Sequence, residues 1–390
     1  MEFHNTLFVM SGLYIHIPFC AKRCIYCDFY SCTHLQFKEA YLAALLREME
    51  IRKDVWKDAV FETIYFGGGT PSLLDDQELK RLFEGIYRNF TVTASPEITL
   101  EANPDDLTGD FVSALKDLPV NRISIGVQSF NDTELRFLNR RHTARQALDA
   151  IERCRKTGLT NISIDLMYGL PEQTATNWSQ TIEKALELDV PHLSAYHLSC
   201  EEGTKLDEMM KNGAVKPIDE EVSETLFRLL IEKLTKAGFV HYEISNFARR
   251  TSGYPHGCIS LHNSSYWKGI HYLGLGASAH SYDGASRSWN IASITDYITN
   301  VRENPDVLSE TEWLDERAKY NDYIITRLRT MWGISLNELR RTFGKVREDD
   351  FLEKSAGLIC RKMLKNQGDC VKVSLKGLFI SDAIMRELIV

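Results

Sequence analysis

Along the first 240 residues, the spacing of hydrophobic positions changes repeatedly between that of a strand and that of a helix. Short runs rich in β-branched and aromatic residues predict strands, and the stretches between them have the spacing of amphipathic helices. The predicted strands cover residues 13–17, 62–66, 97–101, 122–127, 161–167 and 192–197. The predicted helices cover residues 36–53, 75–90, 106–117, 143–157, 174–189 and 219–238. Six strands that are each followed by a helix predict an α/β fold, an incomplete (β/α)6 barrel, with a doubly wound open sheet as the alternative.

The rest of the chain does not continue this alternation of strands and helices. The sequence from 241 to 310 is rich in Gly, Ser, His and aromatic residues and predicts a bridging segment of loops and short elements. Helical patterns follow to about residue 365, and two short apolar runs, 371–374 and 378–380, predict a final β-hairpin. The C-terminal part is therefore expected to be a small, mainly helical module with a winged-helix-like end. The expected organisation is an N-terminal extension 1–12, a barrel 13–240, a bridging segment 241–310 and a C-terminal module 311–390.

Composition and charge narrow the class of protein. The chain has 390 residues, of which 44% are hydrophobic and 26% charged, as expected of a globular protein with two or three domains. A net charge of −8 argues against a nucleic acid held by bulk charge. Neither a membrane-spanning run nor an export signal is visible, so we expect a cytoplasmic protein. Nine cysteines in a reducing compartment indicate metal binding more than disulfides.

A cysteine cluster directly follows the first predicted strand. Cys20, Cys24 and Cys27 are separated by three and then two residues, and Tyr26 precedes the last of them. Three thiolates in one loop hold three irons of a 4Fe–4S cluster and leave the fourth iron open to a substrate or cofactor. One alternative is a tetrahedral zinc site completed by Cys32. The other is cysteines that only pack.

Four further motifs lie at or near the ends of the predicted strands. They are YIHIPFC at 14–20, GGGTP at 67–71, GVQSF at 126–130 and DLMYGLP at 165–171. With these motifs, the chain from residue 13 onward resembles the radical S-adenosylmethionine (SAM) superfamily, in the branch of oxygen-independent coproporphyrinogen III oxidase. The resemblance implies a barrel of the radical SAM type, a 4Fe–4S cluster on Cys20, Cys24 and Cys27, and a SAM molecule at the open iron.

The residues that the resemblance assigns to SAM have suitable chemistry. Glycines let the backbone approach a ligand, strand-end carboxylates accept hydrogen bonds from ribose hydroxyls or an amino group, and arginine pairs with a carboxylate. For each residue taken alone, an ordinary turn or a structural ion pair is the alternative. The implied SAM residues are Tyr14, Tyr26, Gly68, Gly69, Thr70, Glu101, Gln128, Arg140 and Asp165.

The sequence HNSSYW at 262–267 indicates one member of this branch. It resembles the HNxxYW signature of the HemW-type heme chaperones, and a neutral imidazole such as His262 is a good axial ligand of heme iron. Cys258 and His256 are alternative ligands. Phe29 stands where the oxidases carry a fourth cysteine, and their longer N-terminal arm is missing. We therefore expect a heme chaperone. Coproporphyrinogen III oxidase (dehydrogenase), or another radical SAM enzyme acting on a tetrapyrrole, is the alternative, so enzymatic activity stays open.

The resemblance also implies partners. These are heme or another tetrapyrrole, a heme-accepting protein and a flavodoxin- or ferredoxin-like electron donor. Peripheral association with membrane acceptors and a dimer are further expectations. A weaker interpretation is a zinc-stabilised barrel with a DNA-binding tail. The basic stretch 338–347 runs directly into three acidic residues, Glu348, Asp349 and Asp350, which argues against nucleic acid and favours a lid or a docking surface.

Overall fold

A twelve-stranded sheet forms the centre of the computed structural model, which describes residues 9–250 and 258–390. Six parallel strands lie side by side in chain order, which is the singly wound arrangement of a barrel and not the reversing order of a doubly wound sheet. The predicted incomplete β/α barrel is therefore confirmed. These strands are β1 Val9–Ile17, β2 Ala59–Gly68, β3 Thr91–Ala102, β4 Arg122–Gln128, β5 Ile162–Tyr168 and β6 His192–His197.

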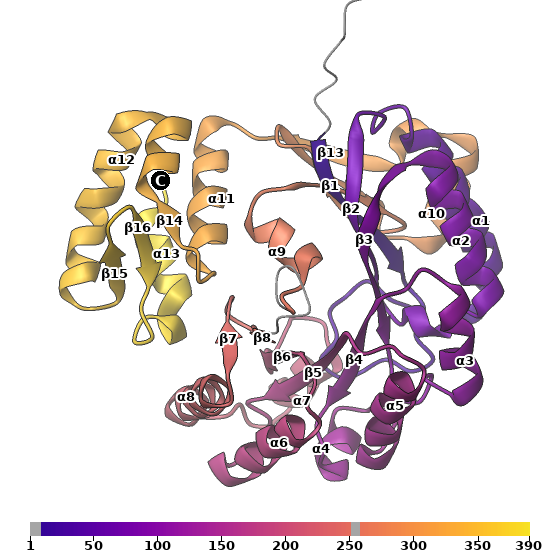
Figure 1. Cartoon of the computed structure of the whole chain (residues 1–390), viewed down its shortest axis with the longest axis horizontal. Helices are drawn as coiled ribbons and strands as arrows, with labels where there is room; N and C mark the ends of the chain where they lie inside the picture. The colour runs from indigo at the N-terminus through magenta and orange to yellow at the C-terminus, as the bar shows by residue number, and fades with distance from the viewer. Residues whose placement is uncertain (1–8, 251–257) are drawn as a thin grey trace, which may run out of the picture.

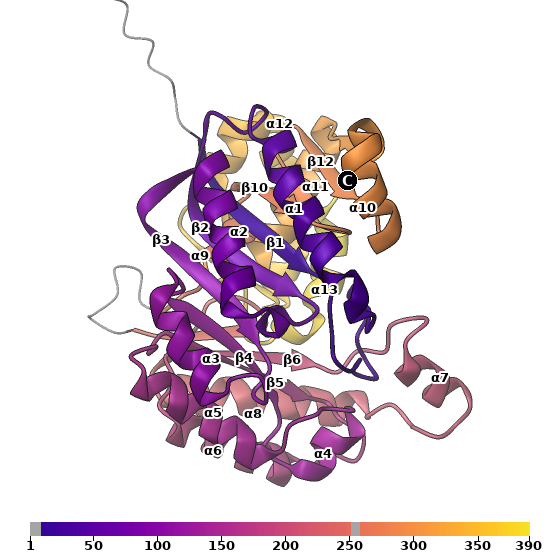
Figure 2. The same ribbon diagram turned by 90° about the vertical axis from the view of Figure 1, so that its right-hand side faces the viewer.

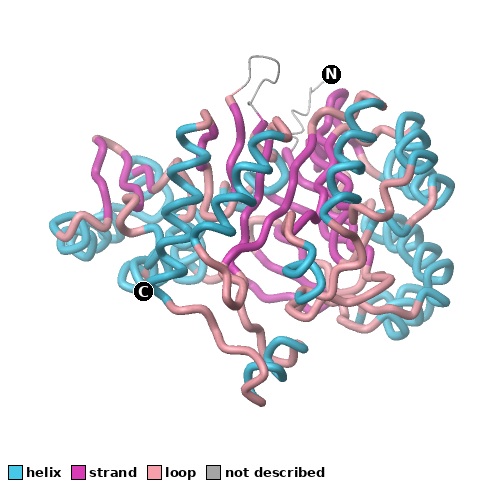
Figure 3. The backbone as a smooth tube through the Cα atoms, turned by 90° about the horizontal axis from the view of Figure 1, so that it is seen from below, coloured by secondary structure: helices cyan, strands magenta, loops and turns pink. Residues whose placement is uncertain are grey.

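Helices cover the outer face of the curved sheet (Figures 1 and 2). Seen from below, the strands curve around the middle of the molecule and helices lie outside them (Figure 3). The helices of this part are α1 Lys38–Arg52, α2 Asp76–Asn89, α3 Gly109–Ala114, α4 Asp132–Phe137, α5 Ala144–Lys156, α6 Ala175–Glu187, α7 Lys205–Lys211 and α8 Glu220–Lys236. The short 3₁₀ turns η1 Leu35–Phe37, η2 Pro71–Leu73 and η3 Leu115–Asp117 lie between them. Helices α4 and α7 were not predicted, because six or seven residues carry too little periodicity.

The first strand begins earlier than the sequence indicates. The predicted extension ends at residue 12, but β1 starts at Val9 and its first residues pair with Ala59, Val60 and Phe61 of β2. A register shift between Ser11 and Gly12 interrupts the ladder, and these two residues separate the apolar Val9 and Met10 from the predicted strand. Residues 1–8 of the predicted extension lie outside the described residues.

Between residues 239 and 313 the chain extends both edges of the barrel sheet, in a region where the sequence indicates loops and short elements. β10 pairs in parallel with β1, and β8 pairs antiparallel with β6. These strands have three to five residues, too few for a readable alternation. The elements are β7 Phe239–His241, β8 Asn246–Arg249, α9 Leu261–Trp267, β10 His271–Leu275, β11 His280–Tyr282, β12 Ser286–Asn290, α10 Ile294–Glu303, η4 Pro305–Val307 and β13 Ser309–Trp313.

The C-terminal module has its own hydrophobic core and a three-stranded antiparallel sheet. The predicted hairpin is wrong in position: its strands are β15 and β16, and Gly368, with a φ of 69°, makes the turn between them. The second predicted strand is instead the 3₁₀ turn η5, which leads into a final helix. The elements are α11 Glu316–Leu328, β14 Ile334–Ser335, α12 Leu336–Cys360, β15 Leu364–Gln367, β16 Cys370–Val373, η5 Leu378–Ile380 and α13 Ser381–Leu388.

The C-terminal module docks beside α9 (Figure 1). The Arg329 guanidinium lies 5.2 Å from the ring centroid of Trp267, and the Lys268 ammonium lies 4.6 Å from that of Trp332. Reciprocal cation–π contacts of this kind stabilise the two parts against each other. None of the helices in the described ranges is both long and apolar enough to cross a membrane.

A buried carboxylate joins α1 to the added strands. Glu48 is fully buried and accepts hydrogen bonds from the Gly276 N–H (2.8 Å), the Asn290 side-chain amide (2.7 Å) and the Tyr297 hydroxyl (2.6 Å). Burial raises the pKa of Glu48, while these donors and Arg52 oppose that rise. The network fixes the added strands to the barrel because all three donors are buried with it.

We expect Glu48→Ala to lower the free energy of unfolding by about 3 kcal/mol or more, because three buried donors lose their acceptor. Urea unfolding followed by circular dichroism measures this change. Glu50→Ala on the same helix is the matched control, since the Glu50 side chain is 46% exposed and forms a surface ion pair with Arg47. Its expected effect is below about 0.5 kcal/mol. Equal effects of the two substitutions would contradict this role of Glu48.

Candidate functional site

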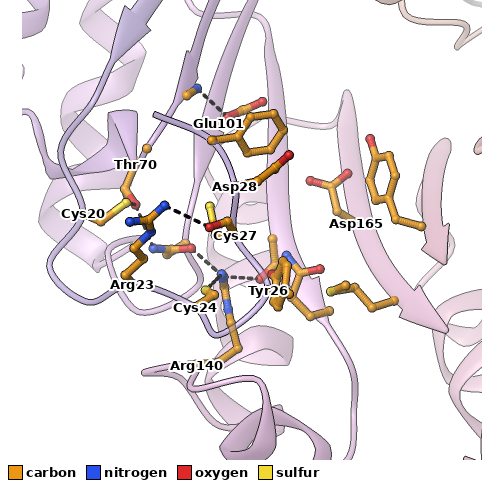
Figure 4. Close-up of a pocket in the computed structure, with 18 of the residues that line it drawn as sticks. Cys20, Arg23, Cys24, Tyr26, Cys27, Asp28, Thr70, Glu101, Arg140 and Asp165 are labelled. Carbon is orange, nitrogen blue, oxygen red and sulfur yellow. Dashed lines mark hydrogen bonds between the residues drawn. The ribbon is translucent and has the colours of Figure 1, made fainter. Parts of the chain in front are cut away.

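A cavity of about 400 Å³ lies at the carboxyl ends of the barrel strands (Figure 4). Its walls come from the loop after β1, the segment after β2 and the last residues of β3 to β6. Carboxyl ends of parallel strands are where folds of this class bind ligands. The lining residues include Cys20, Cys24, Tyr26, Cys27, Gly68, Gly69, Thr70, Glu101, Gln128, Arg140 and Asp165.

The three predicted cluster cysteines all line this cavity, as Figure 4 shows. Cys32 does not line it. Its N–H donates to the Pro18 carbonyl (2.7 Å) and its carbonyl accepts from the Cys20 N–H (2.9 Å), so its backbone closes the base of the loop. Within the described ranges, no three His, Cys, Asp or Glu side chains are placed to hold one metal ion. Three thiols from one loop at the wall of an open cavity fit a 4Fe–4S cluster with one open iron, whereas a structural zinc site needs four protein ligands.

Two polar side chains contact the cysteine sulfurs. An Nη1–H of Arg140 donates to Cys24 Sγ (3.3 Å), and the Thr70 hydroxyl donates to Cys20 Sγ (3.5 Å). Burial raises the pKa of the Cys20 thiol, while the Thr70 hydroxyl and the Arg140 charge oppose this rise. Burial also raises the pKa of Cys27. The environment therefore favours sulfur atoms whose charge is neutralised by a bound cation.

The backbone at the end of β2 packs closely against β1 and the loop that follows it. Gly68 has a φ of 108°, and a Cβ there would lie 2.5 Å from the His16 ring. A Cβ at Gly69 would lie 2.8 Å from the carbonyl oxygen of Phe19. Only glycine permits this approach, which leaves backbone groups of the segment at the cavity wall. The N–H of Gly68 donates to Glu101 (3.2 Å), and Thr70 is positioned over Cys20.

Two half-buried carboxyl groups, on β3 and β5, face the cavity. Glu101 accepts hydrogen bonds from the Tyr65 hydroxyl (2.7 Å) and the Gly68 N–H (3.2 Å), and burial raises its pKa to about 7. Asp165 accepts from the Ser124 hydroxyl (3.3 Å), and burial raises its pKa as well. A ligand that donates hydrogen bonds or carries positive charge stabilises the charged form of such carboxyl groups.

Gln128 and Arg140 complete the polar wall. Gln128 has a φ of 64°, an uncommon backbone conformation for a side chain of this kind and one often found at ligand sites. The Nη2 of Arg140 donates to the Gly126 carbonyl (2.8 Å) and to Asn103 Oδ1 (2.5 Å). Asn103 itself lines the cavity and was not predicted. Its place directly after the third strand, beside Glu101, is the signal that was available for finding it.

Tyr14 and Tyr26 occupy different places. Tyr26 lines the cavity. Tyr14 is not among the lining residues: its hydroxyl bonds His16 Nδ1 (3.0 Å), and its ring lies 6.2 Å from that of Tyr65 inside the barrel. A Cβ at Gly67 would touch both Tyr14 and Glu101, so Tyr14 lies one residue removed from the cavity.

His262 lies away from the cavity, at the start of α9 inside the barrel. Its Nδ1 bonds the Thr63 hydroxyl (2.7 Å), and its Nε2 bonds the Tyr266 hydroxyl (2.8 Å). The ring is buried, which lowers its pKa to about 3 and keeps the imidazole neutral. Of the alternative ligands, Cys258 is buried in a small cluster with Tyr242, and His256 lies outside the described residues. Both nitrogens of His262 are thus engaged in this conformation.

Comparisons with known proteins show the family of the chain. The sequence profile of the Radical SAM superfamily matches residues 14–185. The chain is 34% identical to the heme chaperone HemW of Lactococcus lactis, over 97% of each protein. It is 33% identical to the heme chaperone HemW of Bacillus subtilis, over 96% of this chain and 98% of the relative. The crystal structure of coproporphyrinogen III oxidase (HemN) from Escherichia coli, a radical SAM enzyme, has a similar fold, with a TM-score of 0.85 at 24% identity over 99% of this chain and 91% of that one.

We expect Cys20→Ala, Cys24→Ala or Cys27→Ala to remove most of the iron and acid-labile sulfide that the wild type takes up on anaerobic reconstitution. Each substitution deletes one of the three thiols at the cavity. Cys32→Ala is the matched control and should retain the wild-type content. A loss of metal in Cys32→Ala equal to that in the other three variants would support four-cysteine ligation instead.

We expect Glu101→Gln to change how stability depends on pH. Because the folded state raises the Glu101 pKa from 4.5 to about 7, the protonated form contributes stability that is complete below the ordinary pKa and is lost as the pH rises through 7. The apo wild type should therefore lose about 1 to 1.5 kcal/mol relative to Glu101→Gln between about pH 6 and 8. Urea unfolding at several pH values measures this difference. Parallel pH profiles for the two proteins would show that Glu101 does not titrate there.

Proposed function

The chain belongs to the radical SAM superfamily and, within it, to the family of the heme chaperone HemW, and we propose that it binds heme and delivers it to an acceptor protein. The observation that carries this proposal is the extent of the similarity. The two relatives above that are named heme chaperone HemW match over 96–97% of the chain, which includes α9 and the C-terminal module beyond residue 185. The elements outside the cluster-binding barrel are therefore shared with proteins of that name.

We propose Cys20, Cys24 and Cys27 as the ligands of a 4Fe–4S cluster and the surrounding wall as the SAM site. When bound, the cluster and SAM supply low-potential one-electron chemistry. The chain holds and orients them: Arg140 and Thr70 stabilise charge on the cysteine sulfurs. The other proposed SAM residues are Tyr14, Tyr26, Gly68, Gly69, Glu101, Gln128 and Asp165. Of these, the carboxyl groups of Glu101 and Asp165 accept hydrogen bonds from the ligand, and the two glycines bring backbone groups close to it.

We propose His262 as a heme ligand on α9. Its low pKa keeps the imidazole neutral, which is the form that binds iron. Its nitrogens are both hydrogen-bonded in this conformation, so ligation requires Nε2 to leave the Tyr266 hydroxyl. Tyr266 packs edge-on against the imidazole, with 5.1 Å between the ring centroids, and supplies aromatic surface for a porphyrin. Trp267 is the next residue of the same helix.

A second candidate function is an enzymatic reaction on a tetrapyrrole, such as coproporphyrinogen III oxidation. The cavity that combines three cysteines with two half-buried carboxyl groups supports it, since these groups also suit a reacting cofactor. Phe29 argues against it, because an exposed phenylalanine stands at the cavity mouth where the oxidases carry a fourth cysteine. The likeness to the Escherichia coli oxidase concerns the fold.

The proposed partners follow from the same account. A flavodoxin- or ferredoxin-like protein is proposed to supply the electron for the cluster, and a heme-accepting protein, including acceptors at a membrane surface, to receive the cargo. A dimer is a further proposal. We propose the cytoplasm as the compartment, because a cluster on thiolates requires cysteines that stay reduced.

We expect hemin to bind the reconstituted wild type saturably, with a defined Soret band. His262→Ala should weaken the heme equivalent bound at α9 at least tenfold, because the iron loses its imidazole. Tyr266→Phe is the matched variant: it frees Nε2 from its hydrogen bond and should bind that equivalent as tightly as the wild type or more tightly. Absence of saturable binding by the wild type would overturn the chaperone proposal, and equal binding by His262→Ala would overturn the assignment of His262.

A further inference from the structure

Asn103 lines the cysteine cavity directly after β3 and is not among the residues assigned above to the cluster or to SAM. Pro104 follows it, and a residue before proline prefers an extended backbone. Because Glu101 and Asn103 are two positions apart, an extended backbone turns both side chains toward the same face. Asn103 therefore reaches the cavity from the same strand end as Glu101.

The side chain of Asn103 contacts the two groups that hydrogen-bond cysteine sulfurs. Its Oδ1 accepts from Arg140 Nη2 at 2.5 Å, and its Nδ2 donates to the Thr70 hydroxyl oxygen at 3.3 Å. Arg140 in turn donates to Cys24 Sγ, and Thr70 donates to Cys20 Sγ. Figure 4 shows Thr70 beside Cys20 and Arg140 beside Cys24. One side-chain amide thus supports the contacts to two of the three proposed cluster cysteines.

The direction of each hydrogen bond in this network follows from the chemistry of its members. A guanidinium donates hydrogen bonds and accepts none, so the amide atom that faces Arg140 is the oxygen. The amide nitrogen then faces Thr70 and donates to its hydroxyl oxygen. Because the Thr70 oxygen accepts from Asn103, the single hydroxyl proton is left to point at Cys20 Sγ. Asn103 therefore orients both donors toward sulfur.

The position of the Arg140 guanidinium depends on Asn103. Arg140 Nε is buried and has no hydrogen-bond partner among the described residues, so the two Nη groups hold the guanidinium in place. Nη2 binds Asn103 and the Gly126 carbonyl, which leaves Nη1 directed at Cys24. A Cβ at Gly126 would lie 3.0 Å from Nη2, so glycine leaves the space that the guanidinium occupies. Without Asn103, the Gly126 carbonyl is the partner that Nη2 keeps.

An asparagine that stabilises the strand itself has different partners. Asn121 binds the backbone of β3 twice: its Oδ1 accepts from the Ile98 N–H (2.9 Å), and its Nδ2 donates to the Pro96 carbonyl (2.8 Å). Asn121 does not line the cavity. Both hydrogen bonds of the Asn103 side chain found within the described ranges go to other side chains. These contacts support the surroundings of the cysteines and not the backbone of β3.

We propose that Asn103 is a positioning residue that sets the reduction potential of the cluster. This inference rests on the proposed 4Fe–4S site at Cys20, Cys24 and Cys27. Hydrogen bonds to the cysteine sulfurs stabilise the more negative, reduced form of a cluster and so raise its potential. Asn103 directs the donors of Arg140 and Thr70 at two of these sulfurs, which makes the cluster easier for a protein electron donor to reduce.

The test is a potentiometric titration of the anaerobically reconstituted full-length protein with dithionite, without SAM, followed by electron paramagnetic resonance of the reduced cluster. Asn103→Ala keeps all three cysteines, so it should take up the wild-type amount of iron and sulfide. At a fixed potential, its ratio of reduced to oxidised cluster should be at least tenfold lower than that of the wild type, which is about 59 mV for a one-electron couple. Asn121→Ala is the matched control and should titrate like the wild type.

A second variant separates positioning from a general structural effect. Asn103→Asp keeps an acceptor for Arg140 but draws the Thr70 hydroxyl proton away from Cys20, so the potential should fall here too. In a Thr70→Val background that donor is already gone, and Asn103→Asp should lower the potential by less than it does alone. If Asn103→Ala takes up no cluster, the Asn103→Asp titrations decide the question.

Wild-type potentials in the Asn103 variants, at wild-type iron and sulfide content, would overturn this inference while leaving the cluster in place. Equal shifts on Asn103→Asp with and without the Thr70 hydroxyl would also overturn it, because Asn103 would then not act through that donor. A wild type that takes up no iron and sulfide would instead overturn the proposed cluster site, so the two failures are distinguishable.

Discussion

The close approach of the β2 end to the β1 loop is the contact on which the rest of the site depends. The N–H of Gly69 donates to the Ile17 carbonyl at 2.8 Å, and there is no room for a side chain at that position. This contact places Thr70 against Cys20 and the Gly68 N–H on Glu101. One backbone approach thus sets both the cysteine environment and the polar wall opposite it.

The barrel interior is polar and connects the cavity to α9. Glu101 accepts from Tyr65, whose ring stacks on His262 at 4.9 Å, and His262 bonds Tyr266. Beyond α9, the C-terminal module contacts Trp267 through Arg329. A group bound at Glu101 is therefore three contacts away from α9, the helix that carries the HNSSYW sequence. This chain of contacts joins the wall of the cysteine cavity to α9 through the interior of the barrel.

Features that depend on neighbouring residues in the chain could be predicted from the sequence. The six barrel strands, the cysteine loop and the polar strand ends are local, and the topology then brings Glu101, Arg140 and Asp165 to one cavity. The strands β10 to β13 were missed because each has only three to five residues, and because the pairing of β10 with β1 joins residues far apart in the chain. The predicted hairpin places its turn at Gly377, between the two apolar runs, and only the structure shows that Gly368 makes the turn. The engagement of both His262 nitrogens depends on packing that no motif reports.

The central claim is that this radical SAM chain carries heme and does not consume a porphyrinogen. The most direct test incubates the reconstituted protein anaerobically with hemin, coproporphyrinogen III, SAM and dithionite, and identifies the tetrapyrroles by mass spectrometry. The account predicts that heme is recovered bound to the protein and that coproporphyrinogen III keeps all its propionates. Loss of propionate carboxyl groups as carbon dioxide, in step with SAM consumption, would contradict it and establish an oxidase.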